Sequence, residues 1–355
     1  MSIAISGPSS REDIPADFVA ANDLLEERGW TDGLPVIPPT EKLVREMVKH
    51  SRAAPADVLG IMEPAKNTVT VEKVAANAVM AGCRPEYFPV VLAAVKAILQ
   101  PQFHVGSTMC TTGGAAPVVI VSGPIAETLR INGADSCFAG NYRANSTIGR
   151  AVRLTMRNLG GAKPGGQDKS TQAWPGKMTF CFAENEARLP WEPLRVAQGY
   201  SPDVSTVTVV AVRGLYPVCE GTQETGLGVL ETLAASMRVV GSPIYNQTCW
   251  NLTPVILVLG PEHAAEIAKT FTKSEMQQFL HQHARMSVRD LINRVYYGTE
   301  RWPESIDIND PDATIPIVVR PSDFMIVVAG GDGRHSAWMP AWHECQGGTE
   351  VIEEA

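Results

Sequence analysis

Hydrophobic residues recur three or four positions apart along six stretches of the chain, which places them on one face of a helix. Thr40 and the pair Ser146–Thr147 stand at the start of two of these stretches, where a side-chain oxygen can accept a first-turn N–H, and glycines such as Gly82 follow several stretches. The predicted helices cover residues 17–29, 40–50, 70–82, 85–99, 146–161 and 227–239.

Runs of consecutive apolar residues predict strands that are buried on both faces. The clearest are Pro117–Gly123 and Pro254–Gly260, each a series of Val, Ile and Leu that ends in a Gly-Pro pair. Shorter runs predict further strands at 58–62, 177–183 and 323–329.

The two clearest strands suggest an internal repeat. Each is preceded by a helix, a polar loop and a cysteine, and each is followed by helical sequence, a glycine and a further strand. A repeat of this length predicts an α/β fold of two related lobes about a pseudo-twofold axis, with mixed or mostly parallel sheets. The alternative is a chance likeness between two apolar strands. The predicted division is an arm and strap at 1–55, a first lobe at 56–203 and a second lobe at 204–355.

The segment Trp30–Thr40 combines an Asp-Gly turn with three prolines, which forces an extended path. Such a rigid segment either packs as a strap across a lobe or lines a ligand cleft.

Composition narrows the class of protein. The 355 residues are 45% hydrophobic and 19% charged, and the net charge of -8 argues against a nucleic-acid partner. No signal peptide is recognisable, and the longest apolar stretch, Phe88–Leu99, is too short to span a bilayer. Seven cysteines without a C-x-x-C pair fit a reducing compartment. We expect a cytoplasmic homo-oligomer with no membrane partner.

The densest group of chemically active residues lies in Cys137–Gly166, CFAGNYRANSTIGRAVRLTMRNLGGAKPGG. A polar loop, a helix N-terminus and a second Gly-rich loop could present backbone N–H groups and cations to one anion. The alternative is a solvated helix face between ordinary turns. Residues expected to bind a small anionic substrate are Asn141, Tyr142, Arg143, Asn145 and Lys163.

Two cysteines are candidate nucleophiles. Cys110 lies in a flexible loop of small residues, and Cys137 precedes the basic loop. A neighbouring cation would lower the pKa of either thiol and raise its thiolate fraction, and His104 or Glu184 could act as the base. The alternative is that both cysteines are small buried apolar residues.

Glu184 and Glu186 follow a predicted strand, at the end where α/β sheets commonly carry catalytic groups. Trp191 lies close in sequence, and a carboxyl held against it would have a raised pKa, as suits a general acid or base. We expect Glu184 to be the catalytic carboxyl; the alternative is a solvated turn.

A transition metal is a possible cofactor. His335, His343 and Cys345 follow Asp332 closely, and nitrogen and sulfur ligands suit zinc or a similar ion, although the spacing matches no established motif. The two repeat cysteines, Cys110 and Cys249, are alternative ligands.

Motifs for nucleotides and for the usual serine hydrolases are absent. The sequence has no G-x-G-x-x-G between a strand and a helix, no G-x-x-x-x-G-K-[ST] and no G-x-S-x-G. NAD, ATP and a nucleophile elbow are therefore not expected.

Five phrases within residues 28–210 resemble a group of uncharacterised bacterial proteins. They are WTDGLPVIPPT, VMAGCRPEYFPVVLAAV, NYRANSTIGRAVR, NLGGAKPG and FCFAENEARLPWEPL. The resemblance implies a bacterial cytoplasmic protein. It implies no activity, so it assigns no role to any residue.

These observations predict an enzyme, a lyase or hydrolase, that acts on a small anionic or carboxylate substrate in a cleft between the lobes. One alternative is a metal-dependent enzyme with histidine, cysteine and carboxylate ligands. The other is a non-catalytic binding or assembly subunit.

Overall fold

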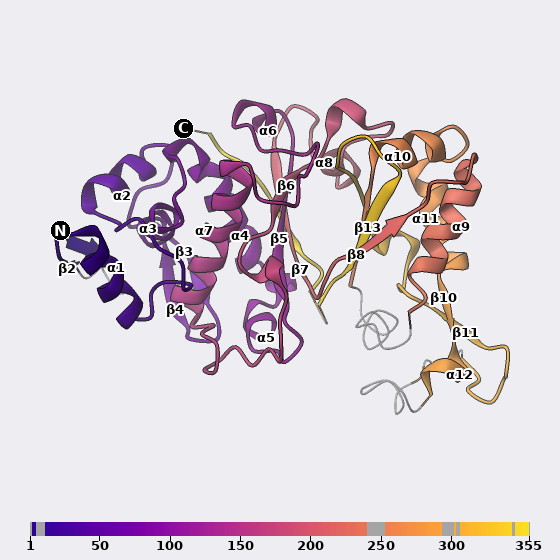
Figure 1. The fold of residues 1–355 in the computed structure, drawn as a ribbon, viewed down its shortest axis with the longest axis horizontal. Helices are drawn as coiled ribbons and strands as arrows, with labels where there is room; N and C mark the ends of the chain where they lie inside the picture. Colours follow the sequence, from indigo (N-terminus) through magenta and orange to yellow (C-terminus); the bar gives the residue numbers. More distant parts are fainter. Residues whose placement is uncertain are drawn as a thin grey trace.

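Two four-stranded mixed sheets form the centre of the fold, and helices cover the outer face of each (Figure 1). This computed structural model describes residues 2–4, 11–239, 253–292, 302, 306–342 and 345–354. The predicted α/β class with mixed sheets is confirmed, because parallel and antiparallel strand pairs occur in both sheets.

The first sheet has the strand order β14-β7-β5-β6. β5 (Ala116–Ser122) runs parallel to β6 (Cys181–Ala183) and antiparallel to β7 (Thr206–Val212), and β14 (Gly348–Val351) pairs antiparallel with β7. Every residue of β5 and β7 is buried. Burial on both faces explains the uninterrupted apolar run from which β5 was predicted.

The second sheet has the strand order β12-β9-β13-β8. β9 (Val255–Leu259) runs parallel to β12 (Phe324–Val328) and antiparallel to β13 (His335–Pro340), which pairs antiparallel with β8 (Tyr216–Cys219). The two sheets thus have the same sequence of pairings: β14-β7-β5-β6 and β8-β13-β9-β12 both read antiparallel, antiparallel, parallel. A duplicated unit would produce this arrangement, although the internal repeat itself stays a prediction.

A long antiparallel ribbon joins the two sheets. One strand of the ribbon is β7 followed by β8, and the other is β13 followed by β14. Between the sheets the pairing continues, because Val212 bridges Ala341 and the Arg213 N–H donates to the Pro340 carbonyl at 3.0 Å. Each ribbon strand therefore belongs to both sheets.

The ribbon alters the predicted division of the chain. β7 and β14 both come from 204–355, the predicted second lobe, yet they complete the first sheet. A boundary at residue 204 therefore does not separate the two sheets, because β7 pairs with β5 across it.

Helices pack on the outer face of each sheet (Figure 1). On the first sheet these are α4 (Phe88–Leu99) and α7 (Arg143–Gly160), and α3 (Val71–Ala81) packs against both of these helices. On the second they are α9 (Gly226–Ser236), α10 (Pro261–Ala268) and α11 (Lys273–His283). Within the described residues, no single helix is long and apolar enough to cross a membrane.

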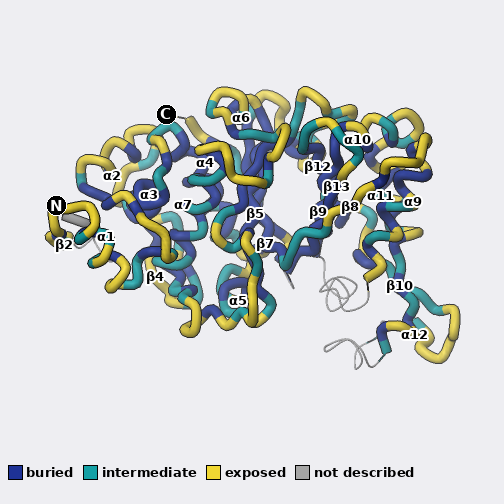
Figure 2. Tube along the Cα trace, viewed as in Figure 1, coloured by how far each residue is buried: buried dark blue, intermediate teal, exposed yellow. Residues whose placement is uncertain are grey.

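Alternate residues of the second sheet point to different cores. Ile256 and Met339 join the apolar core of the first sheet, whereas Leu257, Phe324 and Trp338 pack with α9, α10 and α11. The inner faces of the two sheets therefore share one core. Figure 2 shows the strands of both sheets buried and the connecting loops exposed.

The remaining elements are short. Near the N-terminus they are β1 (Ser2–Ala4), β2 (Arg11–Asp13), α1 (Phe18–Glu27), α2 (Glu41–Val48), β3 (Val58–Met62) and β4 (Asn67–Thr70). Further along they are α5 (Val105–Met109), α6 (Ile125–Thr128), α8 (Leu194–Ala197), β10 (Arg285–Ser287), α12 (Val288–Leu291) and β11 (Thr314–Pro316).

Two helix ends agree with the sequence analysis and one differs. Thr40 caps α2 by accepting the Leu43 N–H, and Gly82 ends α3 with a φ of 86°. The predicted cap of α7 at Ser146–Thr147 is wrong, because the helix begins earlier, at Arg143. The Ser146 and Thr147 hydroxyls instead donate to the carbonyls of Gly140 and Arg143.

Glycines allow α7 to approach its neighbours closely. A Cβ on Gly149 would lie 2.5 Å from Thr179 Oγ1 and 2.7 Å from the backbone nitrogen of Phe180. A Cβ on Gly160, at the other end of the helix, would lie 2.9 Å from the Glu63 carbonyl oxygen. The helix therefore packs backbone to backbone at these two points.

The strap at Trp30–Thr40 is tied to α7. The Arg150 guanidinium donates to both carboxylate oxygens of Asp32, at 2.8 and 2.7 Å, and to the carbonyls of Leu34 and Pro35. Asn158 donates to the carbonyl of Trp30 at 3.0 Å. These bonds give the strap a packing role, and Asp32 also lines a cavity that is described below.

We expect Gly149→Ala to destabilise the protein by about 2 kcal/mol, as overpacking of a tight contact does. Helix propensity alone predicts the opposite, a gain of about 1 kcal/mol for alanine over glycine. The free energy of urea-induced unfolding measures the difference. Gly221→Ala is the control, because a Cβ there meets no atom within 4 Å. A stabilised Gly149→Ala protein would show that α7 can move away from Phe180 freely.

Candidate functional site

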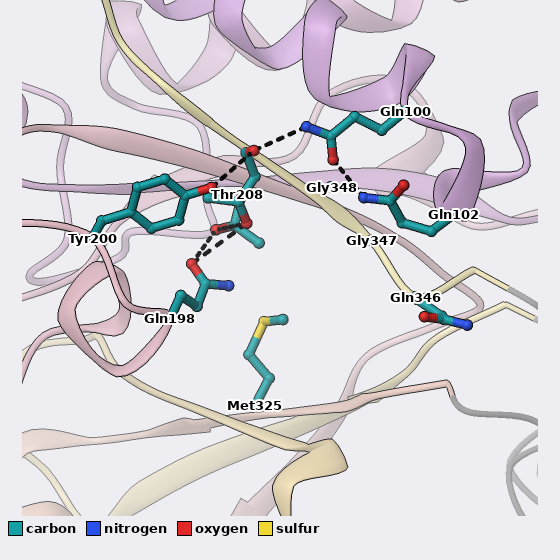
Figure 3. Close-up of a pocket in the computed structure, with 10 residues that line it drawn as sticks. Gln100, Gln102, Gln198, Tyr200, Thr208, Met325, Gln346, Gly347 and Gly348 are labelled. Atoms are coloured by element: carbon teal, nitrogen blue, oxygen red, sulfur yellow. Dashed lines mark hydrogen bonds between the residues drawn. The ribbon is translucent and has the colours of Figure 1, made fainter.

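Three cavities stand out in the described part of the chain. The α7 cavity, of about 510 Å³, lies between α7 and residues 164–178. The strand-end cavity, of about 1000 Å³, lies beyond the C-terminal ends of β5 and β6. The amide cavity, of about 510 Å³, lies at the edge of the first sheet (Figure 3).

The α7 cavity is built from one helix face and one loop. Arg153 and Arg157 are four residues apart on α7, so both reach the same side of the helix. The loop returns Asp168, Ser170 and Lys177 to that side. Its other lining residues are Asp32, Leu154, Pro164, Gly165, Gln172, Ala173, Trp174, Pro175 and Met178.

A single carboxylate in this cavity is shared by two cations. Asp168, only 5% exposed, has one oxygen 2.6 Å from Lys177 Nζ and 3.2 Å from Arg153 Nη2. Its other oxygen accepts the backbone N–H of Ser170 at 3.1 Å and the Ser170 hydroxyl at 2.7 Å. Burial raises the pKa of Asp168, but hydrogen bonds from Lys177 and Ser170 more than offset this and hold the pKa below its ordinary value. Asp168 is therefore ionised, and both of its oxygens already accept from protein groups.

Two residues that line this cavity each carry a buried donor with no hydrogen-bond partner in the described part of the chain. They are Arg157 Nε and the indole Nε1 of Trp174. Trp174 is fixed by its neighbours. Its ring packs edge to face on Phe180, with 5.5 Å between the ring centroids, and a Cβ on Gly176 would lie 2.2 Å from the indole. A buried donor without a partner costs about 1–3 kcal/mol, more when it is charged, so most folds avoid one.

The charges of the cavity do not balance. Arg150 is matched by Asp32, but among the residues that the structure describes Asp168 is the one carboxylate shared by Arg153, Arg157 and Lys177. The cavity therefore lacks negative charge, while Leu154 and other apolar side chains form part of its wall. Such a site suits a carboxylate or phosphate joined to an apolar body.

The expected anion site at Arg143 and Lys163 is not formed. Arg143 begins α7 and Lys163 follows its end, and an 18-residue helix is about 27 Å long. Arg143 donates to the Gly82 carbonyl at 3.1 and 3.2 Å, and Lys163 Nζ packs against Gly29. The expectation that both hold one small anion is wrong, because the helix holds them apart.

The three polar residues of the predicted loop divide between structure and cavity. Asn145 is buried, accepts the Asn132 N–H at 2.8 Å and donates to the carbonyls of Asn132 and Cys137. Tyr142 lines the strand-end cavity, and Asn141 is exposed. Asn145 therefore holds the wall of that cavity in shape.

Glu184 lies in the strand-end cavity and is 4% exposed. It accepts the Leu194 N–H at 2.9 Å and the Ser122 hydroxyl at 2.8 Å. Burial raises the pKa of Glu184, and these two hydrogen bonds only partly offset the rise. The expected direction of the shift, and burial as its cause, are confirmed.

Glu186 and Arg195 complete this buried network. Arg195 pairs with Glu186 and donates to Ser122 Oγ at 3.1 Å, and Glu186 accepts the Gly123 N–H at 2.6 Å. Arg143 and Lys163 take no part in this network, so the three residues predicted to share one hollow lie in three places. Both glutamates therefore accept from protein donors: Glu184 from Ser122 and Leu194, and Glu186 from Gly123 and Arg195 through one of its oxygens.

The expected thiolates are not supported. Burial raises the pKa of Cys137 to about 11. Burial, followed by the charges of Asp168 and Glu63, also raises the pKa of Cys110. The expectation that a neighbouring cation lowers the thiol pKa is therefore wrong for both cysteines.

The expected metal ligands are only partly described. His335 is exposed at the start of β13, while Cys345 is buried and accepts the Ala211 N–H at 3.4 Å. His343 and Cys249 lie outside the described residues. Among those that are described, no group of three or more His, Cys, Asp or Glu side chains could hold a metal ion.

The amide cavity is lined by neutral polar groups (Figure 3). Gln100 donates to the Thr349 carbonyl at 3.0 Å, Gln102 donates to Gln100, and Gln198 accepts from Thr208 at 3.2 Å. Met325 of β12 points in from the second sheet. No charged side chain is among the described residues that line it, so it offers less to an anion than the α7 cavity.

Sequence reasoning missed the residues that surround the α7 cavity. It assigned no ligand to Arg153 or Arg157. Asp168, Ser170 and Lys177 were not considered, although DKSTQAWPGK interrupts the polar loop with a tryptophan that needs burial. No protein-family model matches the chain, and no curated protein matches it.

We expect the Glu184→Gln variant to lose stability relative to the wild type as the pH falls from 7 to 5. The folded-state pKa of Glu184 lies above its ordinary value of 4.5, so the fold binds this proton more tightly than the unfolded chain. The stability that protonated Glu184 contributes is present at low pH and is lost as the pH rises through the folded-state pKa. Glutamine carries no such proton. Urea unfolding of both proteins at each pH measures the difference, and a difference that stays constant would show that Glu184 does not titrate in this way.

Proposed function

We propose that the protein binds a small organic anion in the α7 cavity and is an enzyme, a lyase or hydrolase, that acts on it. The observation that carries the proposal is the surplus of positive charge on the wall of this cavity, where Arg153, Arg157 and Lys177 share one carboxylate, Asp168, among the described residues. An anion there would pair with Arg157 and balance that charge.

The chemistry of the wall narrows the ligand class. A carboxylate or phosphate would accept from Arg157, since a planar guanidinium matches either group. Leu154, Met178 and the face of Trp174 would contact an apolar portion of the same molecule. The ligand we propose is therefore an aromatic or branched aliphatic carboxylate or phosphate.

The site lies within the first sheet and its helices. All residues that line it fall between 32 and 178, so the proposal moves the substrate from an inter-lobe cleft to α7. The described cysteines are all unpaired, which supports a reducing compartment such as the cytoplasm.

We expect Arg157→Met to weaken the binding of 4-fluorobenzoate about 10- to 100-fold, the loss that follows from one hydrogen bond to a charged group. Fluorine NMR line broadening of the ligand measures the affinity, and neutral 4-fluorobenzamide should bind more weakly to the wild type. The variant should unfold at the same urea concentration as the wild type or a higher one, because methionine removes an unpaired buried N–H.

Lys169→Met is the matched control for this test. Lys169 carries the same charge as Arg157 and lies on the loop at 164–178, but it is exposed and, among the described residues, donates to the Gly165 carbonyl at 2.9 Å. It should bind 4-fluorobenzoate as the wild type does. Equal losses in both variants would indicate a general electrostatic effect, and no binding of 4-fluorobenzoate or phenyl phosphate to the wild type would contradict the proposal.

A further inference from the structure

Ser170, Lys177 and Asp168 form a hydrogen-bonded set at the edge of the α7 cavity. Lys177 Nζ donates to the Ser170 hydroxyl oxygen, and the hydroxyl donates to Asp168 at 2.7 Å. Lys177 Nζ also lies 2.6 Å from the other oxygen of Asp168. A hydroxyl in contact with an amine, which a third group orients, is the arrangement of an activated nucleophile and its base.

Charge balance identifies Lys177 as the group that can give up a proton. Asp168 contacts both Arg153 and Lys177, but one carboxylate neutralises one cation. Arginine stays protonated in proteins, whereas lysine can become neutral when it is buried. Burial lowers the pKa of Lys177 below its ordinary value, and its hydrogen bond to Asp168 offsets this only in part.

We infer that Ser170 is a nucleophile and Lys177 its general base, so that the enzyme hydrolyses an ester or amide bond in the organic anion held by Arg157. This inference rests on the anion site proposed above. We favour hydrolysis over elimination, because Ser170 supplies a nucleophile in the cavity where Arg157 would hold the anion.

The reaction that this arrangement supports has two steps. Ser170 Oγ forms a bond to the carbonyl carbon, its proton passes to the neutral Lys177 amine, and Lys177 then protonates the leaving oxygen or nitrogen as that bond breaks. Water attacks the acyl-serine in the second step, giving a proton to Lys177 that returns to Ser170 Oγ as the acid leaves. Asp168 would stabilise the lysine ammonium between the two transfers.

The position of the donors agrees with this role. Arg157 lines the same cavity as Ser170 and has no carboxylate partner among the described residues. Arg157 would therefore hold the anionic end of the substrate in the cavity that Ser170 also lines. The loop geometry is fixed, since Ala173 has a φ of 62° and packs on Gly114.

The test uses mono-4-nitrophenyl succinate, an anionic ester, and the covalent reagent phenylmethylsulfonyl fluoride on the full chain. We expect the wild type to release 4-nitrophenol and to be labelled at Ser170, as shown by peptide mass mapping. Ser170→Ala should lose both, with hydrolysis reduced at least about 100-fold, but should still bind 4-fluorobenzoate.

Lys177→Arg separates the base from a merely structural cation. Arginine keeps the ion pair with Asp168 but gives up no proton, so this variant should fold and bind 4-fluorobenzoate yet hydrolyse the ester at least about 100-fold more slowly. Ser107→Ala, which removes an exposed hydroxyl on α5, should hydrolyse at the wild-type rate.

Two outcomes would overturn the inference while leaving the anion site intact. One is a wild type that binds 4-fluorobenzoate but neither hydrolyses the ester nor is labelled at Ser170. The other is wild-type hydrolysis by Ser170→Ala or Lys177→Arg. Failure of the wild type to bind 4-fluorobenzoate would instead count against the anion site itself, which distinguishes the two proposals.

Discussion

The close approach of α7 to the first sheet governs both the fold and the candidate site. Gly149 and Gly160 bring the helix backbone against Phe180 and Glu63, at distances that leave no room for a side chain. A helix held this tightly has one rotational setting about its axis. Its apolar side chains then meet the sheet, and its arginines face the strap and the loop at 164–178.

This setting concentrates positive charge in one place. Arg150, Arg153 and Arg157 follow one another at three- and four-residue spacing, and only the first has a carboxylate of its own. A fold selected for stability alone would match or expose such charges, since a buried unpaired donor is costly. Bringing Lys177 to the same carboxylate as Arg153 increases the imbalance. The arrangement is therefore better explained by a ligand than by packing.

The sequence predicted those elements whose signals are local. β5 and β9 are recognisable because strands buried on both faces read as unbroken apolar runs, and α2 and α3 because Thr40 and Gly82 mark their ends. It missed the ribbon of β7, β8, β13 and β14, although TVTVVAV is rich in β-branched residues, because pairing across more than a hundred residues leaves no local pattern.

The residues of the site could be predicted only in part, because contacts between distant parts of the chain leave no local pattern. Helical periodicity places Arg153 and Arg157 together, but the path of a loop decides which residues they meet, and Asp168 reaches them through the turn after Pro164. Arg143, Asn145 and Lys163 looked stronger because they lie within one short stretch of sequence. The 18-residue helix α7 keeps Arg143 and Lys163 apart in space, although they are close in sequence. The loop after it folds back and brings Asp168 into contact with Arg153. Clustering along the chain is therefore evidence of a shared site only where no rigid element lies between the residues.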